Sequence, residues 1–233
     1  ITARALGVDL LVHYGHSCLI PMDTKSDLKV LYVFVDIKID PLHFIDTIKL
    51  NFTTDTKICI ISTIQFVSTL QAVAIKLREE DNYQIVVPQS KPLSPGEILG
   101  CTAPKLDKDV QAIIYLGDGR FHLEAMMIAN PQIQAYRYDP YSKIFTKEYY
   151  DHKQMLNIRH EMINRTQNAG TFGVIVGTLG RQGSLKVVDN IVKKLNEHSK
   201  KSVRILMSEI FPNKLKLFDG IDAFVQIACP RLS

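Results

Sequence analysis

The stretch KICIISTI, residues 57–64, decides the fold class of this chain. It is rich in isoleucine, carries no charge after Lys57, and shows little alternation between apolar and polar residues. Such a continuous apolar run is typical of a parallel strand that is covered on both faces. The stretch therefore predicts an α/β protein that contains a parallel sheet.

Similar runs recur along the chain and alternate with segments of helical periodicity. The expected strands are residues 8–14, 29–37, 57–64, 84–88, 110–116, 172–179, 203–208 and 221–228. The expected helices are residues 43–51, 69–80, 149–167, 184–198 and 214–218. Since a strand–helix–strand order gives right-handed crossovers, the sequence predicts open parallel sheets.

The chain also repeats itself. GVDLLVHY at residues 7–14 resembles GIDAFVQI at residues 220–227, and a cysteine follows each of them. We infer three copies of one α/β unit, and we expect them around a pseudo-threefold centre. Their expected bounds are residues 1–26, 27–150 and 151–233. We expect the first and last copies to be truncated. For the first copy, the reason is that the opening ITARAL reads as the second half of a helix.

Composition excludes several classes of protein. The 233 residues are 46% hydrophobic and 22% charged, which is typical of a globular chain and not of a disordered one. The net charge of +4 is mild, and we expect no direct contact with nucleic acid. No apolar run in this sequence reaches the ~18 residues that a membrane span requires, and we expect no secretory signal. We expect a cytoplasmic protein that does not contact membranes.

Three cysteines share a context that suits a metal site. Cys18, Cys101 and Cys229 each lie just after, or in the loop beside, a strand of their own copy. Ligands of α/β sheets bind outside the carboxyl ends of the strands. Three thiolates gathered there would leave the fourth iron of a 4Fe-4S cluster open to a substrate. The alternative is that these cysteines are small buried hydrophobes, which is what we expect of Cys59 in the middle of its strand.

Two glycine-rich loops are candidate cofactor-binding sites. The first contains Gly117, Asp118, Gly119, Arg120 and His122. Its backbone N–H groups and its arginine suit a carboxylate, and its histidine suits a hydrogen bond or a proton transfer. The alternative is a tight turn between a strand and a helix. The second loop occupies the matching position of the third copy and contains Gly180, Arg181, Gln182 and Gly183.

Motifs along nearly the whole chain resemble one known family. They include VHYGHSCLIPMD at residues 12–23, KPLSPGEILGCT at 91–102, YLGDGRFHLEAMMIANP at 115–131 and VQIACPRLS at 225–233. They are similar to those of the eukaryotic 2-(3-amino-3-carboxypropyl)histidine synthase subunit 1 family of diphthamide synthesis. The resemblance implies three similar α/β domains, each of which gives one cysteine to a 4Fe-4S cluster. Carried over by motif, these are Cys18, Cys101 and Cys229.

The same resemblance implies a reaction. The family cleaves S-adenosylmethionine to a 3-amino-3-carboxypropyl radical, which adds to a histidine of translation elongation factor 2. It implies no catalytic residues beyond the cluster ligands, and the two loops are our candidates for holding S-adenosylmethionine. The implied partners are a related second subunit in a heterodimer, an electron-donor accessory protein, and elongation factor 2 as the protein substrate.

Two other functions stay open on the sequence. A dehydratase of the quinolinate synthase type shares the plan of three repeats and three cysteines, and it would use the open iron as a Lewis acid. A non-catalytic scaffold subunit would keep its cysteines as core thiols or use them to hold structural zinc.

Overall fold

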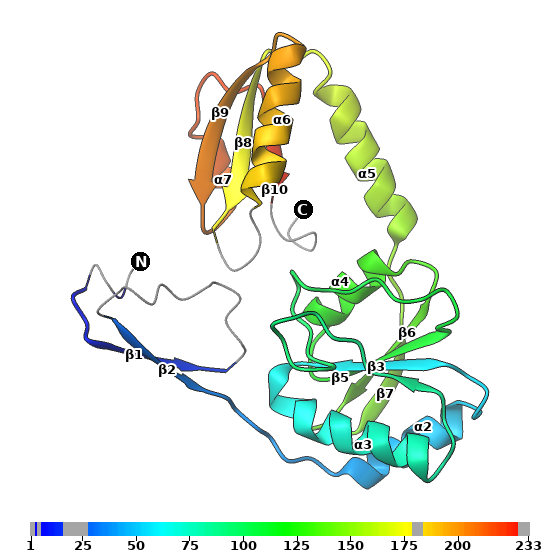
Figure 1. Ribbon diagram of the computed structural model, residues 1–233. Helices are drawn as coiled ribbons and strands as arrows, with labels where there is room; N and C mark the ends of the chain where they lie inside the picture. Colours follow the sequence, from blue (N-terminus) through cyan, green and yellow to red (C-terminus); the bar gives the residue numbers. More distant parts are fainter. Residues whose placement is uncertain (1–2, 4–5, 16–27, 179–183, 228–233) are drawn as a thin grey trace. The chain divides into compact units, whose positions relative to one another are not determined.

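The structure is a computed structural model that describes residues 3, 6–15, 28–178 and 184–227 (Figure 1). Its contacts divide the chain into two compact units, Ile1–Tyr150 and Asp151–Ser233. Each unit is an α/β structure in which parallel strands predominate, as the apolar runs predicted. The arrangement of three copies around a pseudo-threefold centre stays a prediction.

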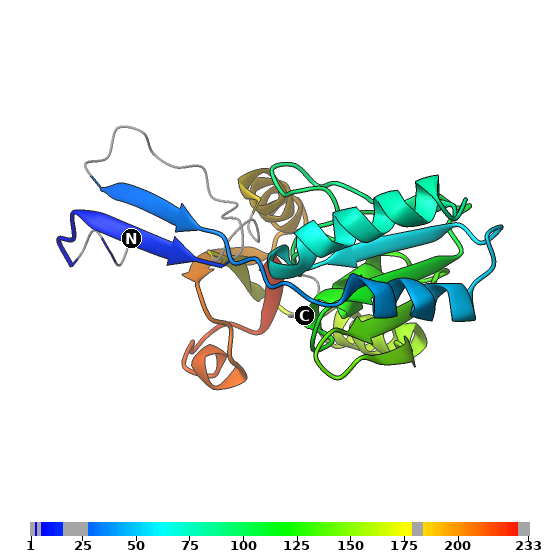
Figure 2. The same ribbon diagram turned by 90° about the horizontal axis from the view of Figure 1, so that it is seen from below.

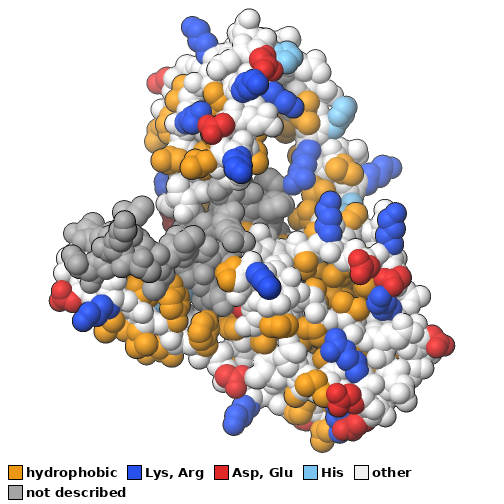
Figure 3. Space-filling model, in the orientation of Figure 1, with side chains coloured by type: hydrophobic (Ala, Val, Ile, Leu, Met, Phe, Trp, Pro, Cys, Tyr) orange, Lys and Arg blue, Asp and Glu red, His pale blue; other side chains and the backbone are white. Residues whose placement is uncertain are grey.

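The first unit opens with a small sheet of two parallel strands, β1 (Leu10–Tyr14) and β2 (Lys29–Val33). Apolar side chains on both strands are exposed to solvent and gather over this sheet (Figure 3). β2, which follows the expected bound between the first and second copies, pairs with β1; the bounds of the copies stay predictions. Which strands become neighbours in a sheet depends on how the chain connects them. The apolar composition of a run does not determine which other strand it pairs with.

The larger sheet of this unit has the strand order β4-β3-β5-β6-β7. Its strands are β3 (Ile58–Ser62), β4 (Ile85–Val86), β5 (Ala112–Leu116), β6 (Gln134–Asp139) and β7 (Ile144–Glu148). All residues of β3 and β5 are buried, because helices cover both faces of the sheet. On one face lie α2 (Pro41–Asn51) and α3 (Val67–Glu79), which contact each other (Figure 2). On the other face lies α4 (Phe121–Ala129).

The β6–β7 hairpin lies outside the strands that were expected from the sequence. Residues Gln134–Asp139 form β6, and β7 pairs with it antiparallel. The aromatic side chains explain the strand: Tyr136 stacks on Phe145 of β7 with 5.3 Å between ring centroids, and Tyr138 is fully buried. Aromatic residues favour strands when a neighbouring strand offers them a packing partner. The sheet is therefore mostly parallel and not wholly so.

The second unit begins with α5 (His152–Arg165), which is capped by the Asp151 carboxylate and has no buried residue. Its sheet has the order β10-β8-β9, with β8 (Thr171–Gly177), β9 (Lys201–Met207) and β10 (Ala223–Ile227) all parallel. The helix α6 (Leu185–Glu197) packs on one face of this sheet, and the short α7 (Pro212–Leu215) follows β9. In the part of the chain that the structure describes, no helix is long and apolar enough to span a bilayer.

Candidate functional site

A cavity of about 510 Å³ lies at the carboxyl ends of β3 and β5 in the first unit. Because these two strands are parallel neighbours, the loops that follow them meet at one edge of the sheet. The lining residues come from the segment after β3, the segment after β5, the loop before Cys101 and the chain around β1 and β2. They are Thr63, Ile64 and Gln65; Tyr115 and Asp118 to His122; Leu99; and Gly15, Val35 and Ile37.

The first predicted loop forms one wall of this cavity. Asp118, Gly119, Arg120 and His122 line it, at the turn that leads from β5 into α4. Gly119 has a φ of +67°, a conformation that residues with a side chain rarely adopt. The backbone N–H of Gly117 donates to the Tyr138 carbonyl over 3.0 Å, which fixes the start of the loop to β6. The loop is thus a tight strand–helix turn and a cavity wall at once.

Tyr115 is a cavity residue that the sequence did not single out. Its side chain is 1% exposed, and its hydroxyl donates to the Asp118 carbonyl at 3.5 Å, the long limit for such a bond. Gly117 leaves room for this ring, since a Cβ there would lie 2.7 Å from it. Burial raises the pKa of Tyr115 to about 12, so it is a neutral phenol at physiological pH. A tyrosine one residue before the end of a buried strand is the signal that could have identified it.

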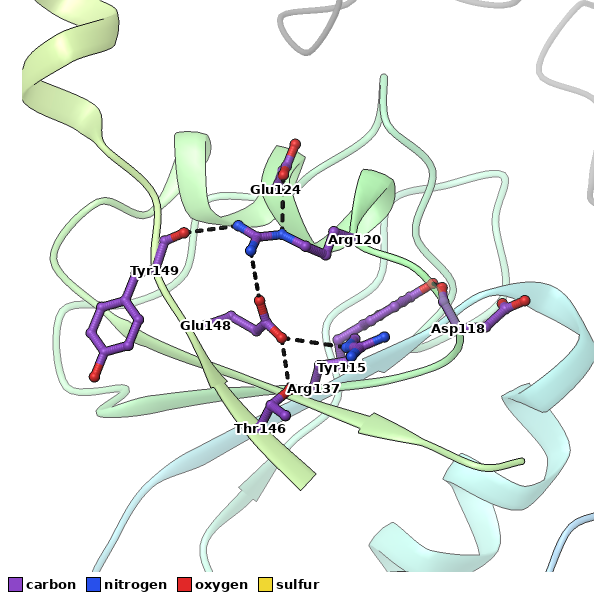
Figure 4. A network of polar contacts seen from close by, with 8 residues as sticks. All are labelled: Tyr115, Asp118, Arg120, Glu124, Arg137, Thr146, Glu148 and Tyr149. Carbon is purple, nitrogen blue, oxygen red and sulfur yellow. Dashed lines mark hydrogen bonds and ion pairs between the residues drawn. The ribbon is translucent and has the colours of Figure 1, made fainter. Parts of the chain in front are cut away.

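The Arg120 guanidinium forms ion pairs and a hydrogen bond with neighbouring groups of the protein (Figure 4). Its Nε lies 3.2 Å from a Glu124 carboxylate oxygen, and one terminal nitrogen lies 3.0 Å from a Glu148 carboxylate oxygen. The other terminal nitrogen donates to the Tyr149 carbonyl over 2.8 Å. All three nitrogens of the candidate carboxylate-binding side chain therefore have protein partners.

Cys101 sits in a loop that folds back on the carboxyl end of β3. The Ser62 N–H donates to the Gly96 carbonyl over 2.9 Å, and the Ile98 N–H donates to the Ser62 carbonyl over 3.0 Å. Cys101 itself is half-buried beside Leu99, which lines the cavity. Cys101 thus lies in a loop that is hydrogen-bonded to the end of β3, and its role as a ligand stays a prediction.

Cys59 occupies a different environment. It lies in the middle of β3, is 0% exposed, and packs among apolar residues under α4. Burial raises the pKa of this thiol to about 12. A metal ligand must be a thiolate, so the buried thiol does not suit that role.

The remaining predicted site residues lie outside the described part of the chain. They are Cys18, Cys229, Gly180, Arg181, Gln182 and Gly183. Among the described residues, no group of three or more His, Cys, Asp or Glu side chains could hold a metal ion. The meeting of the three cysteines, and their service as ligands, stay predictions.

Comparison with known proteins covers the whole chain. A family model described as "putative diphthamide synthesis protein" matches residues 1–233. The chain is 59% identical over 233 residues to the 2-(3-amino-3-carboxypropyl)histidine synthase subunit 1 of Mus musculus, and equally so to that of Homo sapiens. The subunit 1 of Candida albicans is 55% identical over 235 residues. The chain spans about half the length of these curated relatives, 53% of the mouse protein.

Two solved structures share the fold. The crystal structure of Dph2 from Pyrococcus horikoshii with a 4Fe-4S cluster superimposes with a TM-score of 0.76 at 27% identity. A second crystal structure of the same protein gives a TM-score of 0.74. Each comparison covers 99% of this chain and 67% of the other.

Proposed function

Because the chain belongs to the diphthamide synthesis protein family, we propose that its protein catalyses the first step of diphthamide synthesis. In this step S-adenosylmethionine is cleaved to a 3-amino-3-carboxypropyl radical, which is transferred to a histidine of translation elongation factor 2. The observation that carries the proposal is the cavity at the carboxyl ends of β3 and β5, which is flanked by the Cys101 loop. The chain around it is 59% identical to curated subunits of that synthase.

Cys101 is the described residue that suits a cluster ligand. It is half-buried at the strand edge, next to the cavity, whereas Cys59 is sealed in the core. Cys18 and Cys229 complete the proposed ligand set. A 4Fe-4S cluster held by three cysteines has one iron open to a substrate and can supply the electron for reductive cleavage.

The cavity has the size and chemistry of a small-molecule site. Its volume of about 510 Å³ falls within the roughly 300–1,000 Å³ that is usual for such sites. Apolar side chains such as Leu99 and Phe121 line it together with polar groups of the loop after β5. We assign Gly117, Asp118, Gly119 and His122 to S-adenosylmethionine, with His122 as a hydrogen-bonding group.

Further contacts to the cofactor are proposed from the second loop. Gly180, Arg181, Gln182 and Gly183 occupy the matching place of the last copy in the sequence. The proposed partners are a related second subunit, an accessory protein that donates electrons, and elongation factor 2. The designation "subunit 1" of the curated relatives supports a synthase of several subunits. We place the protein in the cytoplasm, where elongation factor 2 acts.

The family match over the whole chain favours this reaction over the two alternatives. A dehydratase of the quinolinate synthase type would not consume S-adenosylmethionine. A scaffold subunit with structural zinc would carry no sulfide.

The test is a turnover experiment with the full-length protein and its second subunit, under anaerobic conditions and with a reductant. S-adenosylmethionine and elongation factor 2 are supplied, and the products are analysed by mass spectrometry. We expect methylthioadenosine and a modified histidine on the factor. Formation of 5′-deoxyadenosine, or no cleavage by a sample that contains the cluster, would contradict the proposal. An elongation factor with that histidine replaced is the control for the site of transfer.

A further inference from the structure

Glu148, the last residue of β7, is a buried carboxylate between two arginines (Figure 4). Its side chain is only 8% exposed. One carboxylate oxygen lies 3.0 Å from an Arg120 nitrogen, and the other lies 3.4 Å from Nε of Arg137. The Thr146 hydroxyl donates to the second oxygen over 2.7 Å. Because burial of an unpaired carboxylate is costly, this site is stable only while its cationic partners are present.

Arg120 is the partner that reaches the cavity. It directly precedes α4, and it is one of the residues that line the cavity. Its side chain is 46% exposed, but each of its three nitrogens is engaged, by Glu124, Glu148 and the Tyr149 carbonyl. A planar guanidinium can hold three such partners in fixed directions, which a lysine ammonium does less well.

The contacts of Arg120 join two parts of the unit that are distant in sequence. At one end is the loop of Asp118 and Gly119, which forms the wall of the cavity. At the other end is Tyr149, which follows β7 and lies two residues before the second unit begins. At its near end the loop is joined to the sheet by the Gly117 N–H, which donates to β6, and by the Tyr115 hydroxyl, which donates to the Asp118 carbonyl. At its far end the Arg120 guanidinium ties the loop to Glu148 of β7 and to the Tyr149 carbonyl.

We propose that Arg120 and Glu148 are positioning residues, which together hold the cavity wall of residues 118–122 in place for its ligand. Arg120 acts through Glu148 and does not bind the ligand carboxylate itself. This inference rests on the proposed function, since S-adenosylmethionine is taken as the ligand. It assigns a role to Glu148, which no sequence motif indicated.

The pair is tested by a double-mutant cycle in the full-length protein with its second subunit. The variants are Arg120→Ala, Glu148→Gln and the two combined, and equilibrium dialysis measures the dissociation constant for S-adenosylmethionine. Glu148→Gln conserves the volume of the side chain and removes its charge. Lys49→Ala is the matched control, because it breaks an exposed ion pair with Asp81 in the same unit.

If the two residues act as a unit, each single variant raises the dissociation constant by about tenfold, and the combined variant is no weaker than Arg120→Ala alone. Iron content per folded protein then stays close to that of the Lys49→Ala control, whereas Arg120→Ala lowers the thermal midpoint because it leaves the buried Glu148 carboxylate with Arg137 as its cationic partner. A combined effect of about a hundredfold, equal to the product of the single effects, would show that Arg120 contacts the ligand independently of Glu148.

Hydrogen exchange of the ligand-free protein gives a second readout. Glu148→Gln is expected to accelerate exchange in residues 117–124 and to leave the central strands β3 and β5 unchanged. Unchanged exchange in residues 117–124 would overturn the inference. If the wild-type protein does not bind S-adenosylmethionine, the proposed function fails, yet the exchange comparison still decides whether Glu148 positions the loop.

Discussion

The contrast between Cys59 and Cys101 shows how the environment of a residue decides its chemistry. Both are cysteines in or beside the same strand, β3, of the larger sheet. Cys59 is sealed between the sheet and α4, and burial raises its thiol pKa to about 12. Cys101 is half-buried and packs against Leu99, which lines the cavity.

We therefore predict opposite results for two substitutions in the full-length protein. Cys101→Ala should abolish the visible absorption of the reconstituted 4Fe-4S cluster and reduce its iron content. Cys59→Ala should retain both, because its thiol is not a thiolate. Equal loss in the two variants would refute the assignment of Cys59 as an inert core residue.

Gly117 is the second residue whose identity matters. A Cβ at this position would lie 2.7 Å from the Tyr115 ring, so Gly117→Ala must displace a buried side chain. We expect a loss of about 1–3 kcal/mol in the free energy of unfolding, measured by urea denaturation, and weaker binding of S-adenosylmethionine. Gly170→Ala is the control, since its nearest contact is an ordinary 3.5 Å. A Gly117→Ala variant as stable as this control would contradict the tight packing of Tyr115.

At the scale of elements, the sequence predicted the buried parallel strands well. The runs at residues 57–64 and 110–116 became β3 and β5, and the end of β5 leads into the predicted loop. A strand buried on both faces has a continuous apolar signal that local sequence contains. The β6–β7 hairpin was missed because its two strands contain polar and charged residues and form no continuous apolar run, and its aromatic residues pack only once both strands are paired.

The Asp222 carboxylate adds side-chain hydrogen bonds to the backbone pairing of β8 and β10. Asp222, just before β10, accepts the backbone N–H groups of Gly170 and Thr171 over 2.9 and 2.8 Å. The hydrogen bond from Thr171 has the larger effect and that from Gly170 the next, and both lower the pKa of the Asp222 carboxyl below its ordinary value. Hydrogen bonds to the charged form stabilise it, so folding favours the ionised carboxylate.

The contribution of Asp222 to the free energy of unfolding therefore depends on pH. Since the pKa is lower in the folded state, the stabilisation is fully present above the unfolded value of about 3.9 and is lost as pH falls through the folded value. Asp222→Asn should therefore lower the thermal midpoint at pH 7 and make its decline at acidic pH shallower. Thermal unfolding followed by circular dichroism between pH 2 and pH 7 measures both. Parallel pH profiles for the variant and the wild type would contradict this role.

At the scale of the whole molecule, the sequence supplied motifs but not the pairing of distant segments. The strand β2 lies beside β1 and outside the larger sheet, which no apolar pattern indicated. The role inferred for Glu148 was hidden for the same reason: its partner Arg120 is 28 residues away in the sequence, and only the fold brings their charges together. The turn between β5 and α4 was predictable because its residues, Gly117 to His122, are consecutive in the sequence.

The central claim is that the full-length protein holds a 4Fe-4S cluster with an iron open to S-adenosylmethionine. Electron paramagnetic resonance tests it most directly, on anaerobically reconstituted protein with its second subunit, reduced with dithionite. We predict the signal of a reduced 4Fe-4S cluster, and we predict that its g values shift when S-adenosylmethionine is added. A folded, iron-loaded sample that gives no such signal, or a signal that S-adenosylmethionine leaves unchanged, would contradict the claim.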